Sequence, residues 1–400
     1  MALVPGEELI FNLKTDPTSI QLTDEDINEK YAKGDVRIIT EQARYPLTAI
    51  TGMVESKDYK LNPEFQRRRR WDSRKQSKLI ESFIMNVPIP PIFLYEDSYS
   101  HYEVMDGLQR LTAIHEFYKN KLVLDGLIEW KELNGRTYDE LPEFVKKGID
   151  RRYLSSIILM QETAKSKEEA QRLKQLVFER INSGGVPLEE QESRNAIYNG
   201  PLNQLCIKLS RNKYFCRAWG IPEPTEEETI TGIISDDLRN NDHYRKMEDV
   251  ELVLRFFAYR QRLNYPKGNQ KEYLDNYLKS GNTLPSNVLI NFENIFNNTI
   301  ELIFEIFGEK AFYLWRSKKN GKWNWYNQPA LTVYDPIMYV FSQHLEDRKR
   351  ILEFGDKFRS SIKGFYQSNY ISFGGSSTTN ISSIQNRNDL FEKFMKDLLG

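Results

Sequence analysis

The segment Asp106-Gly107-Leu108-Gln109-Arg110 contains the residue types of a phosphate-binding junction. It joins an alternating run, HYEVMD, to a run with helical spacing of apolar residues, LTAIHEFY. The sequence therefore predicts a strand that passes through a glycine turn directly into a helix. The first backbone N–H groups of such a helix lack intrahelical partners and carry partial positive charge, so the junction predicts an anion site.

Four side chains or backbone positions of this junction have a chemical role. Arg110 can give a phosphate charge-assisted hydrogen bonds of about 1.5 to 3 kcal/mol each, whereas the helix dipole contributes about 0.3 to 1 kcal/mol. Gly107 lets a bulky anion approach the backbone. Asp106 can hold a magnesium ion or orient the arginine, and Gln109 can position a water or a base. The candidate catalytic residues are Asp106, Gln109 and Arg110; the candidate phosphate ligands are Gly107 and Arg110; the candidate metal ligand is Asp106.

A structural interpretation fits the same residues. Asp106 would cap the helix, Gly107 would relieve the turn, and Arg110 would form a surface ion pair near His101 or Glu116. The pattern D-G-x-Q-R is too short to decide between the two interpretations.

A second candidate site is the basic segment FQRRRRWDSRKQSK, where seven cations against Asp72 give a local charge of +6. Contacts of such residues with phosphates release counterions, which favours polyanion binding. The candidate DNA contacts are Arg68, Arg69, Arg70, Arg74, Lys75 and Lys78. Four successive arginines cannot all face one way, so an ordinary basic surface is the alternative.

The overall composition narrows the class of protein. Lys and Arg number 56 and Asp and Glu 57, so the net charge of −1 gives no global bias toward a polyanion. Cys206 and Cys216 are the only cysteines, which excludes a disulfide framework or a zinc ribbon. Neither a signal sequence nor a run of about 20 apolar residues is present, so we expect a cytoplasmic protein without membrane contact.

The pattern along the chain predicts three regions: a polar arm over 1–40 that orders only against the body, a mixed domain over 41–200, and a helical domain over 201–400. Within the mixed domain, strands are expected at 87–97, 101–106, 121–127 and 153–162, and helices at 48–56, 73–86, 167–181 and 188–200. The strand at 153–162 is nearly continuously apolar and therefore expected to be central.

Three segments, NPEFQRRRRWDSRKQSKLIESFIMNVPIPPIFL, YEVMDGLQRLTAI and FERINSGGVPLEEQESRNAIY, occur in this order. Together, over residues 60–200, they resemble the N-terminal domain family of GmrSD-type restriction enzymes, a branch of the ParB/sulfiredoxin-like superfamily. The resemblance implies an α+β protein, with a ParB-like mixed α/β domain before the mostly helical one. It also implies that a nucleoside triphosphate with Mg²⁺ binds at the junction, where Arg67 and Asn182 line the same cleft.

The sequence departs from this family at two points. The family signature is D-G-Q-Q-R, and Leu108 replaces its first glutamine, which puts turnover in doubt while phosphate binding can survive. Several relatives add a C-terminal His-Asn-His nuclease, but the four histidines here do not have its spacing. We therefore expect no such nuclease, and expect the C-terminal helices to bind a partner or DNA.

Three hypotheses follow. The first is a DNA-associated nucleotide-binding enzyme of a restriction or phage-defence type, in which nucleoside-triphosphate hydrolysis is coupled to DNA recognition or cleavage. The second is a non-catalytic sensor of nucleotide or DNA that acts through a second protein of a defence system. The third is an interaction protein in which the cleft is vestigial.

Overall fold

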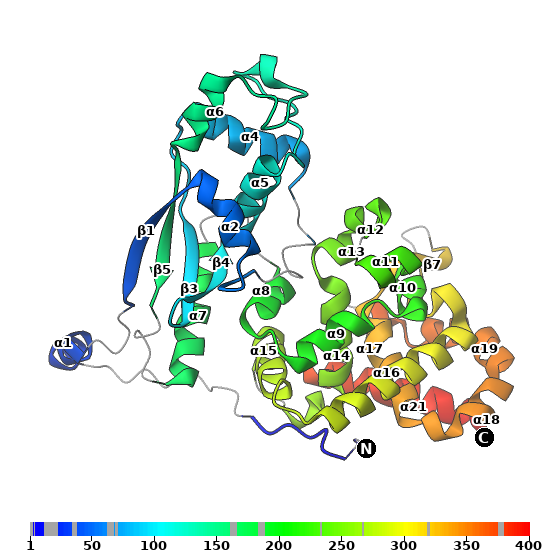
Figure 1. Cartoon of the computed structure of the whole chain (residues 1–400). Helices are drawn as coiled ribbons and strands as arrows, with labels where there is room; N and C mark the ends of the chain where they lie inside the picture. Colours follow the sequence, from blue (N-terminus) through cyan, green and yellow to red (C-terminus); the bar gives the residue numbers. More distant parts are fainter. Residues whose placement is uncertain are drawn as a thin grey trace. The chain divides into compact units, whose positions relative to one another are not determined.

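A computed structural model divides the chain into two compact units (Figure 1). The sheet unit is Ile20–Glu189, and the helical unit is Met1–Ser19 together with Glu190–Gly400. The structure describes residues 3, 5–11, 23–33, 38–61, 68, 71–160, 166–182, 189–232, 234–265, 268–317, 321–374 and 380–400.

The sheet unit is mixed α/β, as predicted. Its elements in chain order are α1 (Asp24–Lys33), β1 (Thr40–Pro46), η1 (Leu47–Ala49), α2 (Ile50–Glu55), β2 (Tyr59–Lys60), α4 (Ser73–Ile84), β3 (Ile92–Ser98), β4 (His101–Asp106), α5 (Leu108–Tyr118), η2 (Lys131–Leu133), α6 (Glu143–Asp150), β5 (Tyr153–Leu159) and α7 (Lys167–Asn182).

Five strands of this unit form one sheet, in the order β1-β5-β3-β4-β2. β5 lies between β1, to which it is antiparallel, and β3, to which it is parallel, so the prediction of a central strand is confirmed. β3 and β4, both predicted as strands, pair as an antiparallel hairpin. β1 was not predicted, because its sequence TEQARYP alternates weakly and its residues are mostly exposed at the edge of the sheet.

The register places different helices on the two faces of the sheet. Leu94 pairs with Val104, and both are buried in the core to which α2, α4 and α5 contribute. Tyr95 pairs with Glu103, whose carboxylate lies 2.7 Å from Lys174 Nζ on α7, and Nζ lies 5.7 Å from the Tyr95 ring centroid. Because successive strand residues alternate between faces, α7 covers the face opposite α5.

Residues 121–127, predicted as a strand, form a loop. Glu81 on α4 is 5% exposed, and its Oε1 accepts hydrogen bonds from the backbone N–H groups of Ile128, Glu129 and Trp130 at 2.9, 2.8 and 3.0 Å. Within 121–127 itself, the N–H groups of Leu124, Asp125 and Leu127 donate to the carbonyl of Arg136, to Ser77 Oγ and to Asn134 Oδ1 at 3.0, 3.0 and 2.9 Å. These amides are therefore satisfied without a neighbouring strand. The prediction was wrong because such side-chain and loop partners cannot be recognised from the local sequence pattern.

Replacing Glu81 with glutamine is expected to lower the free energy of unfolding by about 1 to 2 kcal/mol. The amide keeps an oxygen acceptor but loses the charge that roughly doubles the strength of each bond. The control is Glu129→Gln, which neutralises an exposed carboxylate in the same segment and should change stability by less than about 0.5 kcal/mol. Urea unfolding measures both, and equal stabilities would contradict the role given to Glu81.

The second unit is mostly helical, as predicted. Its elements are α8 (Glu190–Ile197), α9 (Pro201–Leu209), α10 (Lys213–Trp219), α11 (Glu226–Thr231), α12 (Asp236–Asn240), α13 (Asp242–Arg245), α14 (Glu248–Tyr259), η4 (Arg262–Asn264), α15 (Gln270–Gly281), α16 (Ser286–Phe307), η5 (Gly308–Lys310), β6 (Tyr313–Ser317), β7 (Trp323–Pro329), α17 (Leu331–Gln343), η6 (Leu345–Asp347), α18 (Arg348–Glu353), α19 (Gly355–Ser368), α20 (Tyr370–Gly374) and α21 (Ile381–Leu399).

Part of the N-terminal arm packs into the helical unit. Glu7 is buried, and its Oε2 accepts a hydrogen bond from Arg260 Nη2 at 3.0 Å. The backbone N–H of Leu9 donates to Gln261 Oε1 at 3.2 Å. Residues 5–11 are therefore held at the end of α14 by a buried ion pair and a backbone hydrogen bond.

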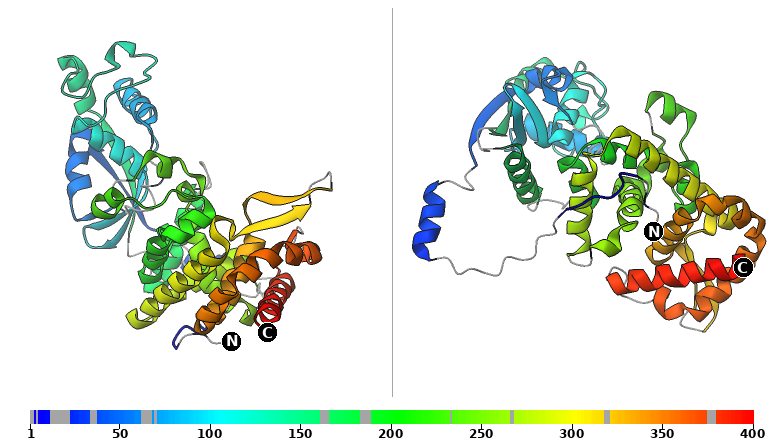
Figure 2. Two further views of the ribbon diagram at one scale, coloured as in Figure 1. Left: turned by 90° about the vertical axis from the view of Figure 1, so that its right-hand side faces the viewer. Right: turned by 90° about the horizontal axis from the view of Figure 1, so that it is seen from below.

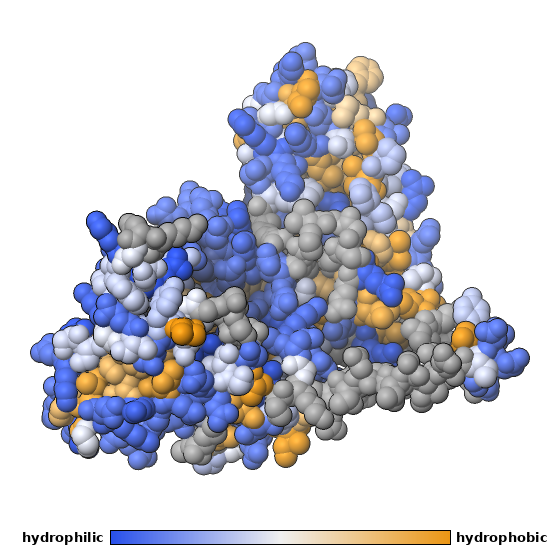
Figure 3. Space-filling model, turned by 180° about the vertical axis from the view of Figure 1, so that it is seen from behind, coloured by the Kyte–Doolittle hydropathy of each residue, from blue (hydrophilic) through white to orange (hydrophobic). Residues whose placement is uncertain are grey.

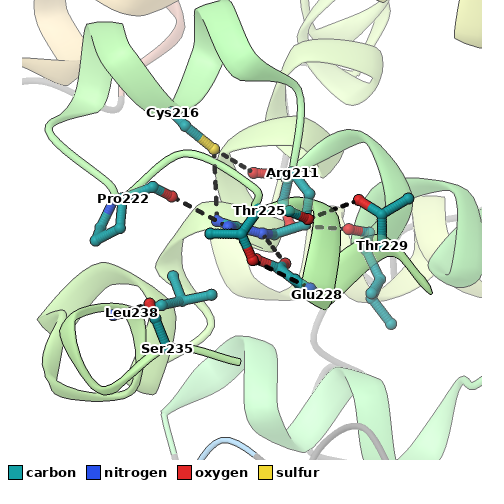
Figure 4. Close-up of polar contacts among 10 residues, drawn as sticks. Arg211, Cys216, Pro222, Thr225, Glu228, Thr229, Ser235 and Leu238 are labelled. Carbon is teal, nitrogen blue, oxygen red and sulfur yellow. Dashed lines mark hydrogen bonds and ion pairs between the residues drawn. The ribbon is translucent and has the colours of Figure 1, made fainter. Parts of the chain in front are cut away.

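A half-buried arginine holds the segment between α10 and α11 (Figure 4). Arg211 donates to both carboxylate oxygens of Glu228, at 2.7 and 2.9 Å, and to the carbonyl of Pro222 at 3.1 Å. Its Nη1 lies 3.5 Å from Cys216 Sγ, and burial raises the pKa of that thiol to about 12. Burial also raises the pKa of the Cys206 thiol. Both cysteines are therefore packing residues and not reactive thiolates.

No helix among the described residues combines the length and the apolar character that crossing a bilayer requires. Hydrophilic residues cover most of the face seen from behind in each unit, with apolar residues in smaller patches (Figure 3). The large apolar side chains are instead concentrated in the two cores.

Candidate functional site

The predicted strand–glycine–helix junction is present. β4 ends at Asp106, Gly107 is the N-cap residue, and α5 begins at Leu108. Gly107 has φ +99°, and a Cβ at this position would lie 2.3 Å from Cγ2 of Ile92 on β3. The backbone conformation and the packing on β3 both require glycine here, whether or not a ligand binds.

Arg110 lies in the first turn of α5 and reaches back to the ends of two strands. Its Nη2 donates to Asp106 Oδ2 at 2.7 Å and to the carbonyl of Pro91 at 3.2 Å. The Arg110 side chain is 15% exposed, and its buried Nε has no hydrogen-bond partner. Arg110 forms its ion pair with Asp106, and not with His101 or Glu116, so Asp106 orients the arginine.

The start of α5 is suited to an anion. No side chain caps this helix, so its first N–H groups keep their partial positive charge beside the unused Nε donor of Arg110. In the described part of the chain no group of three or more His, Cys, Asp or Glu residues is placed to hold a metal ion. Magnesium is commonly held by one or two carboxylates and the phosphates of a nucleotide. The residues present are thus compatible with a phosphate group, and Asp106 is the carboxylate beside it that would hold Mg²⁺.

The two residues between Gly107 and Arg110 have packing roles. Gln109 Oε1 accepts a hydrogen bond from the backbone N–H of Trp71 at 3.1 Å, which ties the segment before α4 to the junction. Leu108 is 7% exposed and belongs to the core of the sheet unit. The oxygen predicted to position a water thus holds a backbone amide, and the position at which the motif departs from D-G-Q-Q-R is buried.

Replacing Leu108 with glutamine restores D-G-Q-Q-R and is expected to lower the free energy of unfolding by about 1 to 3 kcal/mol. The cost arises because an amide enters an apolar core without a partner. Leu108→Met is the control, since an apolar side chain of similar volume should cost less than about 1.5 kcal/mol. A glutamine variant as stable as wild type in urea unfolding would show that this side chain can turn outward, toward a ligand.

Several of the predicted site residues are not placed at the junction by the structure. Arg67, Arg69 and Arg70 lie outside the described residues. Asn182 is the last residue of α7, and its side chain is outside the described part. Arg68 is 4% exposed, so its guanidinium is not presented to a partner as large as DNA.

The other predicted DNA contacts are exposed on α4. Arg74 Nε lies 3.0 Å from Asp125 Oδ2, with 75% of the arginine side chain exposed. Lys75 Nζ lies 5.5 Å from the ring centroid of Trp71, and Lys78 is exposed one turn further on. The backbone amide of Trp71 is hydrogen-bonded to Gln109 of the junction. The three cations therefore come directly after a residue that contacts the junction.

Sequence reasoning missed two contacts of the junction, the carbonyl of Pro91 and the amide of Trp71. Both are backbone groups far along the chain from their partners. Side-chain type gives no signal for such contacts, although both residues lie in the first of the three segments that carry the resemblance.

Comparison with known proteins gives one family match, over part of the chain. Residues 50–199 match the family model described as GmrSD restriction endonuclease, N-terminal domain. No curated protein and no solved structure matches the chain. The matched range contains α4, the junction and α7, so it includes all three segments of the resemblance. Residues 50–199 are therefore similar to the N-terminal domain of GmrSD restriction endonucleases, which confirms the resemblance that the three sequence segments indicated.

Proposed function

We propose that the sheet unit binds a nucleoside triphosphate at the β4–α5 junction and that nucleotide binding is coupled to the recognition or cleavage of DNA. The observation that most supports this is Arg110, a largely buried guanidinium held by Asp106 beside an uncapped helix start, with an unused donor. A guanidinium in this position can form charge-assisted hydrogen bonds with an anion that binds at the helix N-terminus.

In this proposal each group at the junction has a separate role. Arg110 and the first N–H groups of α5 hold phosphate oxygens, and Gly107 leaves the backbone accessible to them. Asp106 keeps the guanidinium oriented and provides a carboxylate for Mg²⁺. When bound, the metal ion would neutralise charge on the phosphates. The exposed cations Arg74 and Lys78 of α4 would contact the DNA backbone.

A second candidate function is a sensor that binds nucleotide without turnover and signals to a second protein of a defence system. Two observations favour it. Leu108 is buried where the family motif has glutamine, and Gln109 Oε1 is engaged by the Trp71 amide. Neither arrangement supports a side chain that orients an attacking water, whereas phosphate binding needs only Arg110 and the backbone.

A thermal-shift panel of the four ribonucleoside triphosphates with Mg²⁺, followed by phosphate release with and without duplex DNA, tests the proposal. A ligand at 100 times its Kd adds about 2.7 kcal/mol of stability. Stabilisation with DNA-dependent phosphate release supports the enzyme, and stabilisation without release supports the sensor. If no nucleotide stabilises the protein and DNA does not bind at low salt, both are wrong.

A further inference from the structure

β6 and β7 form a two-stranded antiparallel hairpin that extends from the helical unit (Figure 2, left view). Trp315 pairs with Trp325, and Arg316 pairs with Asn324. Residues directly opposite each other share a face, and neighbours along a strand alternate. Around these pairs, one face of the hairpin therefore carries tryptophans and the other carries Arg316 and Asn324.

The tryptophan face packs against the helical unit. Trp315 contacts Trp325 edge to face at 5.4 Å between centroids, and Lys363 Nζ of α19 lies 4.7 Å from the Trp315 ring. Trp323 makes a similar edge contact with Tyr370 of α20, at 5.6 Å. These contacts fix the tryptophan face on the helices, whereas Asn324 on the opposite face is exposed.

The polar face carries residue types that read DNA. Arg316 lies over the ring of Tyr326, with its guanidinium carbon 3.8 Å from the centroid. Among the described residues no carboxylate forms an ion pair with Arg316, so its charge is oriented by the ring without being neutralised. Asn324 and Gln328 are exposed, and Gln328 Nε2 donates to Tyr326 Oη at 3.4 Å.

The charge of this region is complementary to a polyanion. Residues 310–334 contain no Asp or Glu, although 57 of the 400 residues in the chain are acidic. The same 25 positions contain five cations and so carry a charge of +5: Lys310, Arg316, Lys318, Lys319 and Lys322. At the average frequency of about one in seven, three or four acidic residues would be expected there. The segment that contains the hairpin is thus strongly basic within a nearly neutral chain.

We propose that the β6–β7 hairpin binds duplex DNA, with its polar face in the major groove. The major groove, about 12 Å wide, admits a two-stranded ribbon, and arginine pairs with guanine and asparagine or glutamine with adenine at its base edges. Arg316 and Asn324 supply these groups together with Gln328, which is linked to Arg316 through Tyr326, and Lys322 supplies a phosphate contact beside them. The inference deepens the proposed function, because it names the element of the helical unit that contacts DNA.

Duplex binding by the full chain, measured by fluorescence anisotropy over a range of salt concentrations, tests the charge contribution. The double variant Arg316→Gln, Lys322→Gln removes two cations and should reduce the salt slope by about 1.8. Raising salt from about 50 to about 200 mM would then weaken wild type about 12-fold more than this variant. The control is Lys213→Gln, an exposed lysine 4.7 Å from the Tyr214 ring in the same unit, which should bind as wild type does.

Base reading and groove choice are tested separately. Asn324→Ala with Gln328→Ala should flatten the preference within a randomised duplex pool and leave the salt slope unchanged. Methyl green, a major-groove ligand, should compete with the protein, and netropsin, a minor-groove ligand, should not. The inference would be overturned if the hairpin variants bound duplex DNA as the Lys213→Gln control does, or if they affected only single-stranded DNA. Neither outcome bears on nucleotide binding at the junction, which the thermal-shift panel tests separately.

Discussion

Replacing Arg255 with alanine is expected to lower the free energy of unfolding of the helical unit by about 3 to 5 kcal/mol. Arg255 on α14 donates from Nε and Nη2 to the two carboxylate oxygens of Asp335 on α17, at 2.7 Å each. The side chains are 1% and 4% exposed. The truncation therefore leaves a carboxylate buried without its cation, which costs much more than the loss of a surface pair.

The double variant Arg255→Met, Asp335→Leu removes both charges and should recover most of the stability lost in the single variant, because no unpaired ion remains. Arg359→Ala is the control: it breaks a pair with Asp356 in the same unit, with the two side chains 50% and 96% exposed, and should cost less than about 1 kcal/mol. Urea unfolding followed by tryptophan fluorescence suits the test, since four of the six tryptophans lie in the helical unit. A double variant as unstable as Arg255→Ala would contradict the explanation by an unpaired charge.

The elements of the junction could be predicted because their signals are local. Alternation before Asp106, glycine at 107 and helical spacing after it each involve only a few residues, and all three agree on a strand, a turn and a helix. The same is true of α4 and α7, whose apolar stripes repeat over several turns. The order of strands in the sheet, in contrast, depends on contacts between distant segments and cannot be predicted from any single segment.

The partners of the junction could not be predicted. Arg110 could have paired with any nearby carboxylate, and the choice of Asp106 and the Pro91 carbonyl depends on β3 and β4 ending side by side. The loop at 121–127 illustrates the converse. Leu122 and Leu124 alternate as in a strand, but the Asp125 amide between them and Leu127 is satisfied by Ser77 Oγ, 48 residues away.

The β6–β7 hairpin was not predicted although the sequence contains a signal for it. Asn320-Gly321, a dipeptide that favours hairpin turns, stands between two short runs rich in aromatic residues. The long helical patterns on both sides of this region made a helical interpretation the stronger one.

The buried arginines could not be predicted either. Arg255 and Arg387 are each 1% exposed, and nothing in their sequence neighbourhood distinguishes them from surface arginines.

Replacing Arg110 with alanine is expected to weaken nucleoside-triphosphate binding by about 100-fold. One or two charge-assisted hydrogen bonds to phosphate, each of about 1.5 to 3 kcal/mol, would be lost together with the positive charge. Arg110→Lys should retain part of the affinity, because a lysine keeps the charge but not the two-pronged donor geometry. The affinities are measured by titration calorimetry with the nucleotide that stabilises wild type most.

Arg152 provides a matched control for this experiment. Like Arg110, it is a partly exposed arginine of the sheet unit, and its Nε donates to the carbonyl of Phe83 at 3.2 Å, the same length as the bond from Arg110 to Pro91. Arg152→Ala therefore removes a similar packing and hydrogen-bonding contribution without touching the junction. Equal affinity losses in the two alanine variants would mean that Arg110 acts through the stability of the sheet unit. A loss confined to Arg110→Ala, graded through Arg110→Lys, would assign the phosphate to the guanidinium that Asp106 holds at the start of α5.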